Sequence, residues 1–230
     1  MEIRLTLGAL FFDVDGTLVD SNDLHVRAWE LAFASIGVAF DRATIHGQIG
    51  KGTDMLVPTL IPDADDALME RLSAAHGKLF KGELLQQVQP FPGARDLIAR
   101  ARAAGLKIVL ASSASGGEVD HYLDLLDIRE LVDATTSSDD VEHTKPAPDV
   151  FQAALKKVAP LAPDEVLVIG DTPYDVQAAA ACGIGTVALR SGKFADSVLQ
   201  EAGALAIYDD VAALLADYDR SPLEPQRDAG

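Results

Sequence analysis

The most constraining feature of the sequence is an apolar run that ends abruptly in two carboxylates. Residues 5–12 have the composition and length of a buried strand, and Asp13 and Asp15 follow it directly. Strands covered on both faces belong to parallel sheets, which present their chemistry where the strands end. Alternate strand residues point to opposite faces, so the two carboxylates can share one side only if the backbone stays extended through Val14. Gly16 then permits a turn, and we expect a functional site at this edge of the sheet.

The second half of the chain supports a parallel sheet, because strand and helix patterns alternate from Ala94 onwards. Short apolar runs predict strands at 107–111, 131–134, 166–169, 186–189 and 204–208. One helix ends at Gly105, and helical spacing predicts further helices at 118–126, 148–158, 174–181, 195–201 and 211–218. The sequence therefore predicts an α/β fold with a doubly wound parallel sheet.

Residues 20–88 interrupt this alternation with helical patterns alone. Apolar residues recur on one helical face at Leu24, Ala28, Ala32 and Ile36. Helices are also expected at 53–60 and 64–86, with an ambiguous segment at 41–48 between them. We therefore expect a core of residues 1–19 and 89–220, a helical insertion at 20–88 with hinges near Asp20 and Pro90, and a C-terminal tail at 221–230.

The composition limits the partners of the protein. With 230 residues and a hydrophobic fraction of 48%, the chain can bury a sizeable core, and we expect a monomer or a weak homodimer. Its formal charge of -17 argues against nucleic acid or an anionic membrane, because both bind through clustered Lys and Arg. The lone Cys182 excludes an internal disulfide and fits a reducing compartment. No apolar run approaches the ~20 residues of a membrane helix, so we expect a cytoplasmic protein.

The segment Asp13-Val14-Asp15-Gly16-Thr17 resembles the DxDGT signature of the haloacid dehalogenase-like phosphohydrolase superfamily. A loop with acidic caps is the alternative interpretation of these residues taken alone. The resemblance implies a Rossmann-like core, with residues 20–88 as the small helical cap of the superfamily. It also implies phosphate chemistry, because the dehalogenases of the superfamily lack an acid at the position of Asp15.

A serine follows the strand expected at 107–111. Ser112 resembles the second motif of the superfamily, in which a Ser or Thr hydroxyl binds a phosphoryl oxygen. Ser113 and Ser115 compete for this role, and a serine here could also serve only as a helix cap. The position directly after the strand favours Ser112.

Lys145 and two further carboxylates extend the resemblance. Lys145 matches the KPxPxxF motif, whose two prolines stiffen the loop, although a lone lysine is a solvated surface charge in most proteins. Asp171 and Asp175 match a GDxxxD motif and can face one direction if a helix begins between them. Capping of that helix by Asp171 or Thr172 is the alternative role for this motif.

Four carboxylates in one site would repel one another and resist ionisation. A divalent cation removes this repulsion, and an all-oxygen site that also contacts a substrate phosphate suits Mg²⁺. Zinc is disfavoured because no paired histidines or cysteines appear. We therefore expect a Mg²⁺ site formed by Asp13, Asp15, Asp171 and Asp175.

The resemblance implies phosphoryl transfer through an aspartyl phosphate. Asp13 would attack phosphorus while Lys145 and Ser112 neutralise the oxygens. Asp15 would protonate the leaving alkoxide and then deprotonate the hydrolytic water. The expected catalytic residues are thus Asp13, Asp15, Ser112 and Lys145, and the expected partner is a small phosphorylated metabolite such as a sugar or polyol phosphate.

Three residues are candidates for substrate contacts. His25 lies in a His-Val-Arg-Ala-Trp segment that resembles the hinge-proximal helix of the β-phosphoglucomutase-like branch, although a lone helical histidine is more often a packing or surface residue. Lys51 lies between two glycines and suits contact with a substrate anion or hydroxyl, with an ordinary turn as the alternative. Thr17 is the residue that hydrolytic members usually carry at its position.

Two other functions remain open. A β-phosphoglucomutase-like mutase is the nearest alternative, but Thr17 and the lack of an arginine at Gly52-Thr53 both favour hydrolysis. A phosphoaccepting signalling module also combines acidic pairs, Mg²⁺ and a Lys-Pro dipeptide. Such modules are shorter and have neither DxDGT after the first strand nor a helical insertion there. The sequence therefore favours a Mg²⁺-dependent phosphatase.

Overall fold

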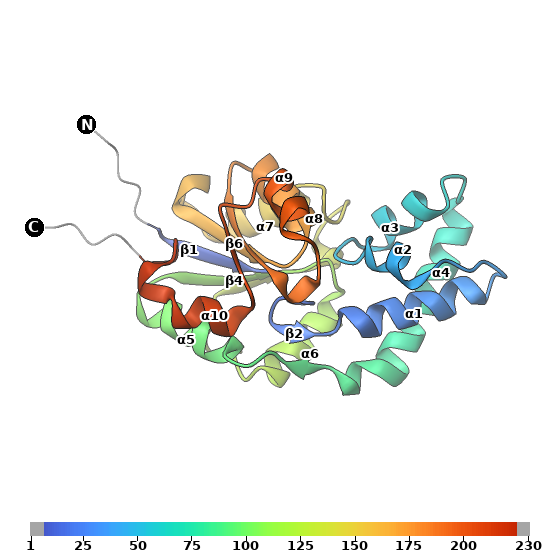
Figure 1. Cartoon of the computed structure of the whole chain (residues 1–230), viewed down its shortest axis with the longest axis horizontal. Coiled ribbons are helices and arrows are strands. Elements are labelled where there is room, and N and C mark those ends of the chain that lie inside the picture. The colour runs from blue at the N-terminus through green and yellow to red at the C-terminus, as the bar shows by residue number, and fades with distance from the viewer. Residues whose placement is uncertain (1–6, 225–230) are drawn as a thin grey trace, which may run out of the picture.

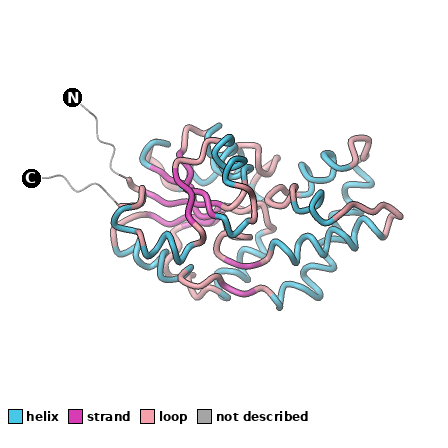
Figure 2. The backbone as a smooth tube through the Cα atoms, viewed as in Figure 1, coloured by secondary structure: helices cyan, strands magenta, loops and turns pink. Residues whose placement is uncertain are grey.

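A parallel sheet forms the centre of the molecule (Figures 1 and 2). The computed structural model describes residues 7–224, and within them six strands pair in the order β5-β4-β1-β6-β7-β8. The strands are β1 (Ala9–Phe12), β4 (Lys107–Ala111), β5 (Ala134–Thr136), β6 (Val166–Gly170), β7 (Gly185–Leu189) and β8 (Ala206–Tyr208). The fold belongs to the doubly wound α/β class that the sequence predicts.

Three strands begin later than expected: β1 at Ala9, β5 at Ala134 and β8 at Ala206. Residues 5 and 6 of the first expected strand lie outside the described residues. The strand expected at 131–134 begins only at Ala134, because Leu131 closes a turn in which its N–H donates to the Ile128 carbonyl. Leu131 and Val132 pack against the core from this turn, which explains their apolar character.

Helices cover both faces of the sheet, as the complete burial of β1 requires. Leu10 and Phe12 pack on the face covered by α5 (Ala94–Ala103), α6 (Gly116–Leu125) and α10 (Val211–Ala216). Ala9 and Phe11 pack on the opposite face, under α7 (Asp149–Lys157) and α8 (Pro173–Ala181). The remaining helix, α9 (Asp196–Ala202), packs beside α8. The strand register therefore places alternate side chains in two separate cores.

A second body of helices lies to the right of the sheet in Figure 1. It comprises α1 (Asn22–Ala34), α2 (Arg42–His46), α3 (Thr53–Leu60) and α4 (Asp66–Leu79), followed by a π-helical turn (Phe80–Leu84) and a 3-10 turn (Leu85–Gln87). The helix expected at 64–86 is thus divided among three helical types. Trp29, Phe33 and Leu72 belong to a hydrophobic cluster that is separate from the clusters of the sheet. We refer to residues 20–88 as the helical region.

A short antiparallel ribbon joins the two bodies. It consists of β2 (Val19–Asp20) and β3 (Gln89–Pro90), with Val19 opposite Pro90 and Asp20 opposite Gln89. The residues expected to act as hinges therefore lie side by side in space. Each strand is only two residues long, too short for a sequence pattern to reveal.

The C-terminal segment packs further than expected. Ser221 and Leu223 belong to the expected tail, yet both are buried, and Leu223 joins the cluster that contains Leu10. Residues 225–230 of the tail lie outside the described residues. Across residues 7–224, no helix combines the length and apolar character needed to cross a membrane.

Candidate active site

Neighbouring strands deliver the candidate residues to one edge of the sheet. Asp13 follows β1, Ser112 follows β4 and Asp171 follows β6, and β1 lies between the other two strands. Because parallel strands all end at the same edge, residues far apart in the chain meet there. Lys145 reaches the same edge from the loop before α7.

Lys145 is completely buried and lies among negative groups. Its Nζ lies 2.6 Å from Asp13 Oδ1 and 2.7 Å from Asp175 Oδ1, and it donates to the Ala111 carbonyl at 2.7 Å. Burial alone lowers the pKa of a lysine, but the charges of Asp13 and Asp175 outweigh it and raise the pKa of Lys145. The ammonium is therefore a fixed positive charge beside Asp13.

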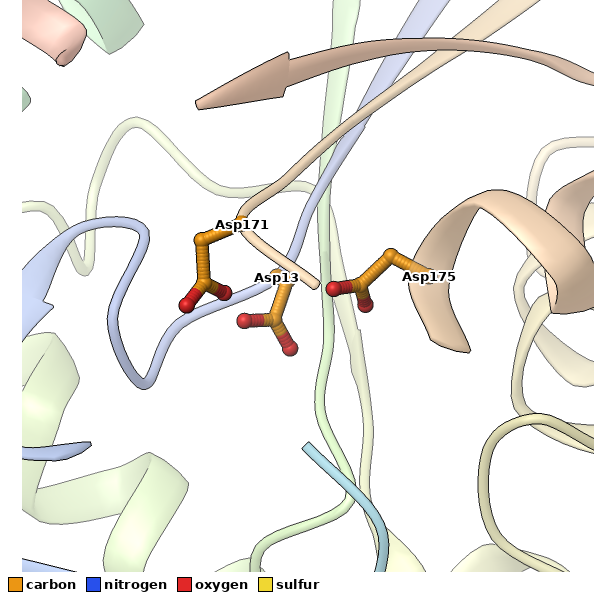
Figure 3. A group of neighbouring side chains, drawn as sticks. All are labelled: Asp13, Asp171 and Asp175. Atoms are coloured by element: carbon orange, nitrogen blue, oxygen red, sulfur yellow. The ribbon is translucent and has the colours of Figure 1, made fainter. Parts of the chain in front are cut away.

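The carboxylates of Asp13, Asp171 and Asp175 form a group at the edge of the sheet (Figure 3). One oxygen each from Asp13, Asp171 and Asp175 lies within 4.8 Å of the others. Burial raises the pKa of Asp13 to about 7, despite the opposing charge of Lys145, and Asp175 adds to the rise. Burial and the charges of Asp13 and Asp175 raise the pKa of Asp171 well above its usual range. Buried acids that resist ionisation at such short range fit a cation with oxygen ligands, because the cation neutralises them.

Thr17 and Asn22 orient the carboxylates. The Thr17 hydroxyl lies 3.2 Å from Asp13 Oδ2 and 3.0 Å from Asp171 Oδ1, and the Asn22 amide donates to Asp171 Oδ2 at 2.8 Å. Gly16 has φ 78°, and a Cβ there would overlap Asp171 and Asn22. Thr17 is fully buried in this network, so its role here is to hold carboxylates in place.

Asp175 is fixed by the start of α8. Its Oδ2 accepts from the Thr172 N–H at 3.1 Å and from the Thr172 hydroxyl at 2.7 Å, and Thr172 caps the helix in return. This capping box leaves Oδ1 facing Lys145. Thr172 therefore has the capping role expected as the alternative for this motif, while Asp171 and Asp175 both belong to the carboxylate group.

Asp15 lies in a different network. Its Oδ1 accepts from the Ser21 hydroxyl at 2.6 Å and the Tyr122 hydroxyl at 2.8 Å, and it lies 3.1 Å from His25 Nε2. Burial raises the pKa of Asp15, but the charge of His25 and these hydrogen bonds hold it below its usual value. The structure thus brings together three of the four expected metal-ligating carboxylates and places the carboxylate of Asp15 apart from them.

His25 belongs to an aromatic stack in the helical region. Its Nδ1 lies 3.3 Å from His76 Nε2, its ring centroid is 3.8 Å from that of Phe80, and the rings of His76 and Trp29 are 4.3 Å apart. Burial lowers the pKa of His76 well below its usual value, so His76 is neutral beside His25. The histidine expected only as a substrate candidate is therefore held rigidly against Asp15.

A cavity of about 390 Å³ lies between the sheet edge and the helical region. Asp13, Asp15 and Ser112 line one side, and His25, Trp29 and Lys51 line the other. The Ser112 hydroxyl accepts from the Ala114 N–H at 3.0 Å, which fixes the loop after β4. The Ser113 hydroxyl is buried without a hydrogen-bond partner, so the structure does not remove the competition between the serines.

Lys51 lines the cavity, and its ammonium is hydrogen-bonded to other residues of the helical region. Its Nζ donates to Gln48 Oε1 at 2.6 Å and to Thr59 Oγ1 at 3.2 Å, and it lies 4.6 Å from the centre of the Tyr174 ring. Burial lowers its pKa. Its partners are neutral, so the ammonium keeps its charge available to a bound molecule.

Several residues of the site could not be found from the sequence. Tyr122 is remote in the chain from Asp15, and His76 shows only ordinary helical spacing. Asn22 and Ser21 follow the DxDGT segment closely, so proximity to that motif was the one available signal.

Comparison with known proteins gives concordant matches. Residues 7–183 match the model of the haloacid dehalogenase-like hydrolase family. The Arabidopsis thaliana protein SUPPRESSOR OF QUENCHING 1, chloroplastic, is 31% identical over 211 residues, which cover 89% of this chain but only 20% of that protein. A crystal structure of a hydrolase from Pseudomonas syringae has a TM-score of 0.87 at 33% identity and covers 93% of this chain and 98% of its own.

Two bacterial relatives match over most of their length. A phosphoglycolate phosphatase of Rhodospirillum rubrum is 28% identical over 215 residues, covering 90% of this chain and 88% of the relative. A phosphorylated carbohydrates phosphatase of Thermotoga maritima is 28% identical over 210 residues, covering 86% of this chain and 93% of the relative. The chain therefore spans about a fifth of the plant protein and nearly all of the bacterial ones.

Proposed function

The chain belongs to the haloacid dehalogenase-like hydrolase family, and on that basis we propose that it is a Mg²⁺-dependent phosphatase of small phosphorylated metabolites. The observation that carries the proposal is the division of labour between two carboxylates after β1. Asp13 lies against the Lys145 ammonium and two further carboxylates, whereas Asp15 lies against a histidine and two hydroxyls. Environments this different suit a nucleophile and an acid–base group.

Asp13, Asp171 and Asp175 are the residues that would hold Mg²⁺. When bound, the cation supplies positive charge to the phosphoryl oxygens and keeps the three carboxylates ionised. Oxygen ligands without thiolate or imidazole suit Mg²⁺ better than zinc.

In the proposed reaction, an oxygen of Asp13 attacks phosphorus and the bond to the leaving oxygen breaks. Lys145 and the Ser112 hydroxyl neutralise the phosphoryl oxygens, and Asp15, which shares a proton with His25 Nε2 at 3.1 Å, delivers that proton to the leaving alkoxide. A water molecule then attacks the phosphorus of the aspartyl phosphate, and Asp15 takes a proton from that water. Phosphate leaves, and both aspartates return to their starting states.

The helical region acts in this proposal as a cap that closes over the site and excludes water. Beyond the two catalytic aspartates, the cavity lining carries three carboxylates and two lysines, namely Asp54, Glu118, Glu142, Lys51 and Lys81. A second anion on the substrate gains little in such surroundings, whereas a sugar hydroxyl can donate to a carboxylate such as that of Glu142. The lining therefore supports a neutral, hydroxyl-bearing leaving group, and the name of the Thermotoga maritima relative agrees with it.

A substrate panel tests the proposal. Phosphate release is measured with sugar phosphates, polyol phosphates, phosphoglycolate and an aryl phosphate, in Mg²⁺ and in excess EDTA. We expect Mg²⁺-dependent release, with a higher kcat/KM for sugar phosphates than for phosphoglycolate. No release from any ester would overturn the phosphatase. An isomeric sugar phosphate formed faster than free phosphate, from a hexose 1-phosphate and a bisphosphate primer, would replace it with a mutase.

A further inference from the structure

The loop between α2 and α3, together with the first turn of α3, contacts the loop before α7 and the start of α8. The N–H of Thr144 donates to Asp54 Oδ2 at 2.8 Å, and the Thr144 hydroxyl donates to Asp54 Oδ1 at 2.5 Å. The Gly52 N–H donates back to the same hydroxyl at 2.8 Å. Nearby, the Tyr174 hydroxyl of α8 donates to the Gly47 carbonyl. A single residue of the core, Thr144, thus makes three hydrogen bonds to the helical region, two through its hydroxyl and one through its backbone N–H.

Glycines permit this close approach. A Cβ on Gly52 would lie 2.5 Å from Thr144 Cγ2, and a Cβ on Gly50 would lie 2.8 Å from Thr172 Cγ2. Gly50 also has φ 101°, which side chains rarely adopt. Thr144 precedes Lys145, and Thr172 caps the helix that carries Asp175. The loop therefore touches both segments that place charged groups against Asp13.

We propose that Asp54 is a positioning residue, which acts through Thr144 to fix Lys145 when the helical region closes. Asp54 holds the Thr144 N–H, and the Thr144 carbonyl accepts from the Ala147 N–H at 3.0 Å, so the backbone on both sides of Lys145 is fixed. Lys145 then extends to Asp13 at 2.6 Å. When the helical region opens, Thr144 loses both hydrogen bonds to Asp54, and the loop that carries Lys145 loses its support from that side.

Asp54 also lines the cavity, so direct contact with the substrate is the competing role. Both of its oxygens already accept hydrogen bonds from Thr144, which favours the positioning role. The two roles make different predictions, because a positioning residue affects every substrate and depends on Thr144. This inference depends on the proposed phosphatase activity only in its kinetic test.

Asp54→Ala, Thr144→Val and the double variant test the coupling. We expect each single variant to lower kcat/KM by roughly tenfold for both a sugar phosphate and an aryl phosphate, mainly through kcat. The kcat/KM of the double variant should be no lower than that of the more impaired single variant. Asp41→Ala is the matched control, because Asp41 accepts from the N–H and hydroxyl of Thr44 in the same manner within the helical region alone. Additive losses, or a loss confined to the sugar phosphate, would overturn the proposal.

Amide hydrogen exchange tests the same contact without turnover. The Thr144 N–H should exchange at least about tenfold faster in Asp54→Ala, and the Gly52 N–H should do so in Thr144→Val, while Asp41→Ala leaves both unchanged. Unchanged exchange in the first two variants would overturn the coupling. If instead exchange responds but no phosphate ester is hydrolysed, the coupling stands and the proposed phosphatase fails.

Discussion

The two walls of the cavity hold their charged groups in different ways. At the sheet edge, Lys145 and its partners Asp13 and Asp175 are buried and compensate one another, so each depends on the others. In the helical region, Lys51 is bonded to neutral partners, Gln48 and Thr59. Removal of Lys145 would leave two buried carboxylates without their positive partner, whereas removal of Lys51 would leave only neutral partners behind. We therefore expect the sheet edge to set the chemistry and Lys51 to act in substrate selection.

Asp13→Asn should have the largest effect, because it removes the proposed nucleophile from the sheet edge. The amide keeps the volume and can still accept from Lys145, so we expect activity to vanish while the melting temperature stays close to that of the wild type. Ser112→Ala removes one hydrogen bond to charge, worth roughly 1.5–3 kcal/mol, and should lower kcat by about tenfold to a hundredfold. Steady-state phosphate release checks both. Asp63→Asn, at an exposed position, is the control. Near-normal activity in Asp13→Asn would remove the covalent mechanism.

Asp15→Asn should separate substrates by leaving group, which sharpens the contrast between the two aspartates. An alkyl phosphate needs a proton on its leaving oxygen, so its first step should slow by roughly a hundredfold to ten-thousandfold, and that of an aryl phosphate by much less. Single-turnover release of the alcohol or phenol measures this step. Equal slowing with both substrates would contradict the role of Asp15 as acid.

The sheet edge should lose stability with rising pH when Mg²⁺ is removed. The pKa of Asp13 is raised to about 7 in the folded protein, above its usual value of 3.8. Between these values the folded state holds a proton that the unfolded state releases, so stability falls as pH rises towards 7. The proposed cation, Mg²⁺, would bind the ionised carboxylates, and it should therefore raise the melting temperature more at pH 8 than at pH 5.5. A thermal shift that does not depend on pH would contradict this.

The helical region should respond to pH with the opposite sign. The pKa of His76 is lowered well below 6.5 by burial, so the unfolded state takes up a proton first as pH falls. The stability that His76 contributes is complete above pH 6.5 and is lost as pH falls below that value. Melting temperatures in Mg²⁺ between pH 5 and 7.5 measure the slope. The His76→Phe variant keeps the aromatic stack and should reduce the slope of melting temperature against pH. An unchanged slope in that variant would assign the effect elsewhere.

Lys51→Ala should have the smallest effect and should depend on the substrate. We expect kcat/KM for the preferred sugar phosphate to fall by about threefold to tenfold, as for the loss of one hydrogen bond. An aryl phosphate, which has no hydroxyl to reach Lys51, should be hydrolysed nearly as before. An equal fall in kcat/KM with both substrates would show that Lys51 contributes to catalysis of every substrate and not to substrate selection.

The sequence predicts the sheet edge well because its residues are tied to local structure. Asp13 ends an apolar strand, Asp171 ends another, and prolines mark the loop of Lys145, so each position follows from a nearby pattern. Parallel pairing then brings the strand ends together without further information. The strand at β5 was misplaced because Leu131 and Val132 are apolar for packing in a turn.

The network around Asp15 escapes such reasoning because tertiary packing creates it. Tyr122 lies on α6 and His76 on α4, and nothing near either residue in the sequence indicates a role at the site. The contact between Asp54 and Thr144 likewise depends on how the helical region sits against the core. Local patterns predict what each element is, and only the packed structure shows which side chains meet.

The β2–β3 ribbon has a consequence for folding. Ala9 of β1 pairs with Lys107 of β4, although the whole helical region lies between them in the chain. The ribbon joins the entry and exit of that region, with Asp20 opposite Gln89, so a folded helical region acts as a short link between the two strands. Because closing a loop costs more entropy the longer the loop is, early folding of the helical region would make the central strand pairing a local event.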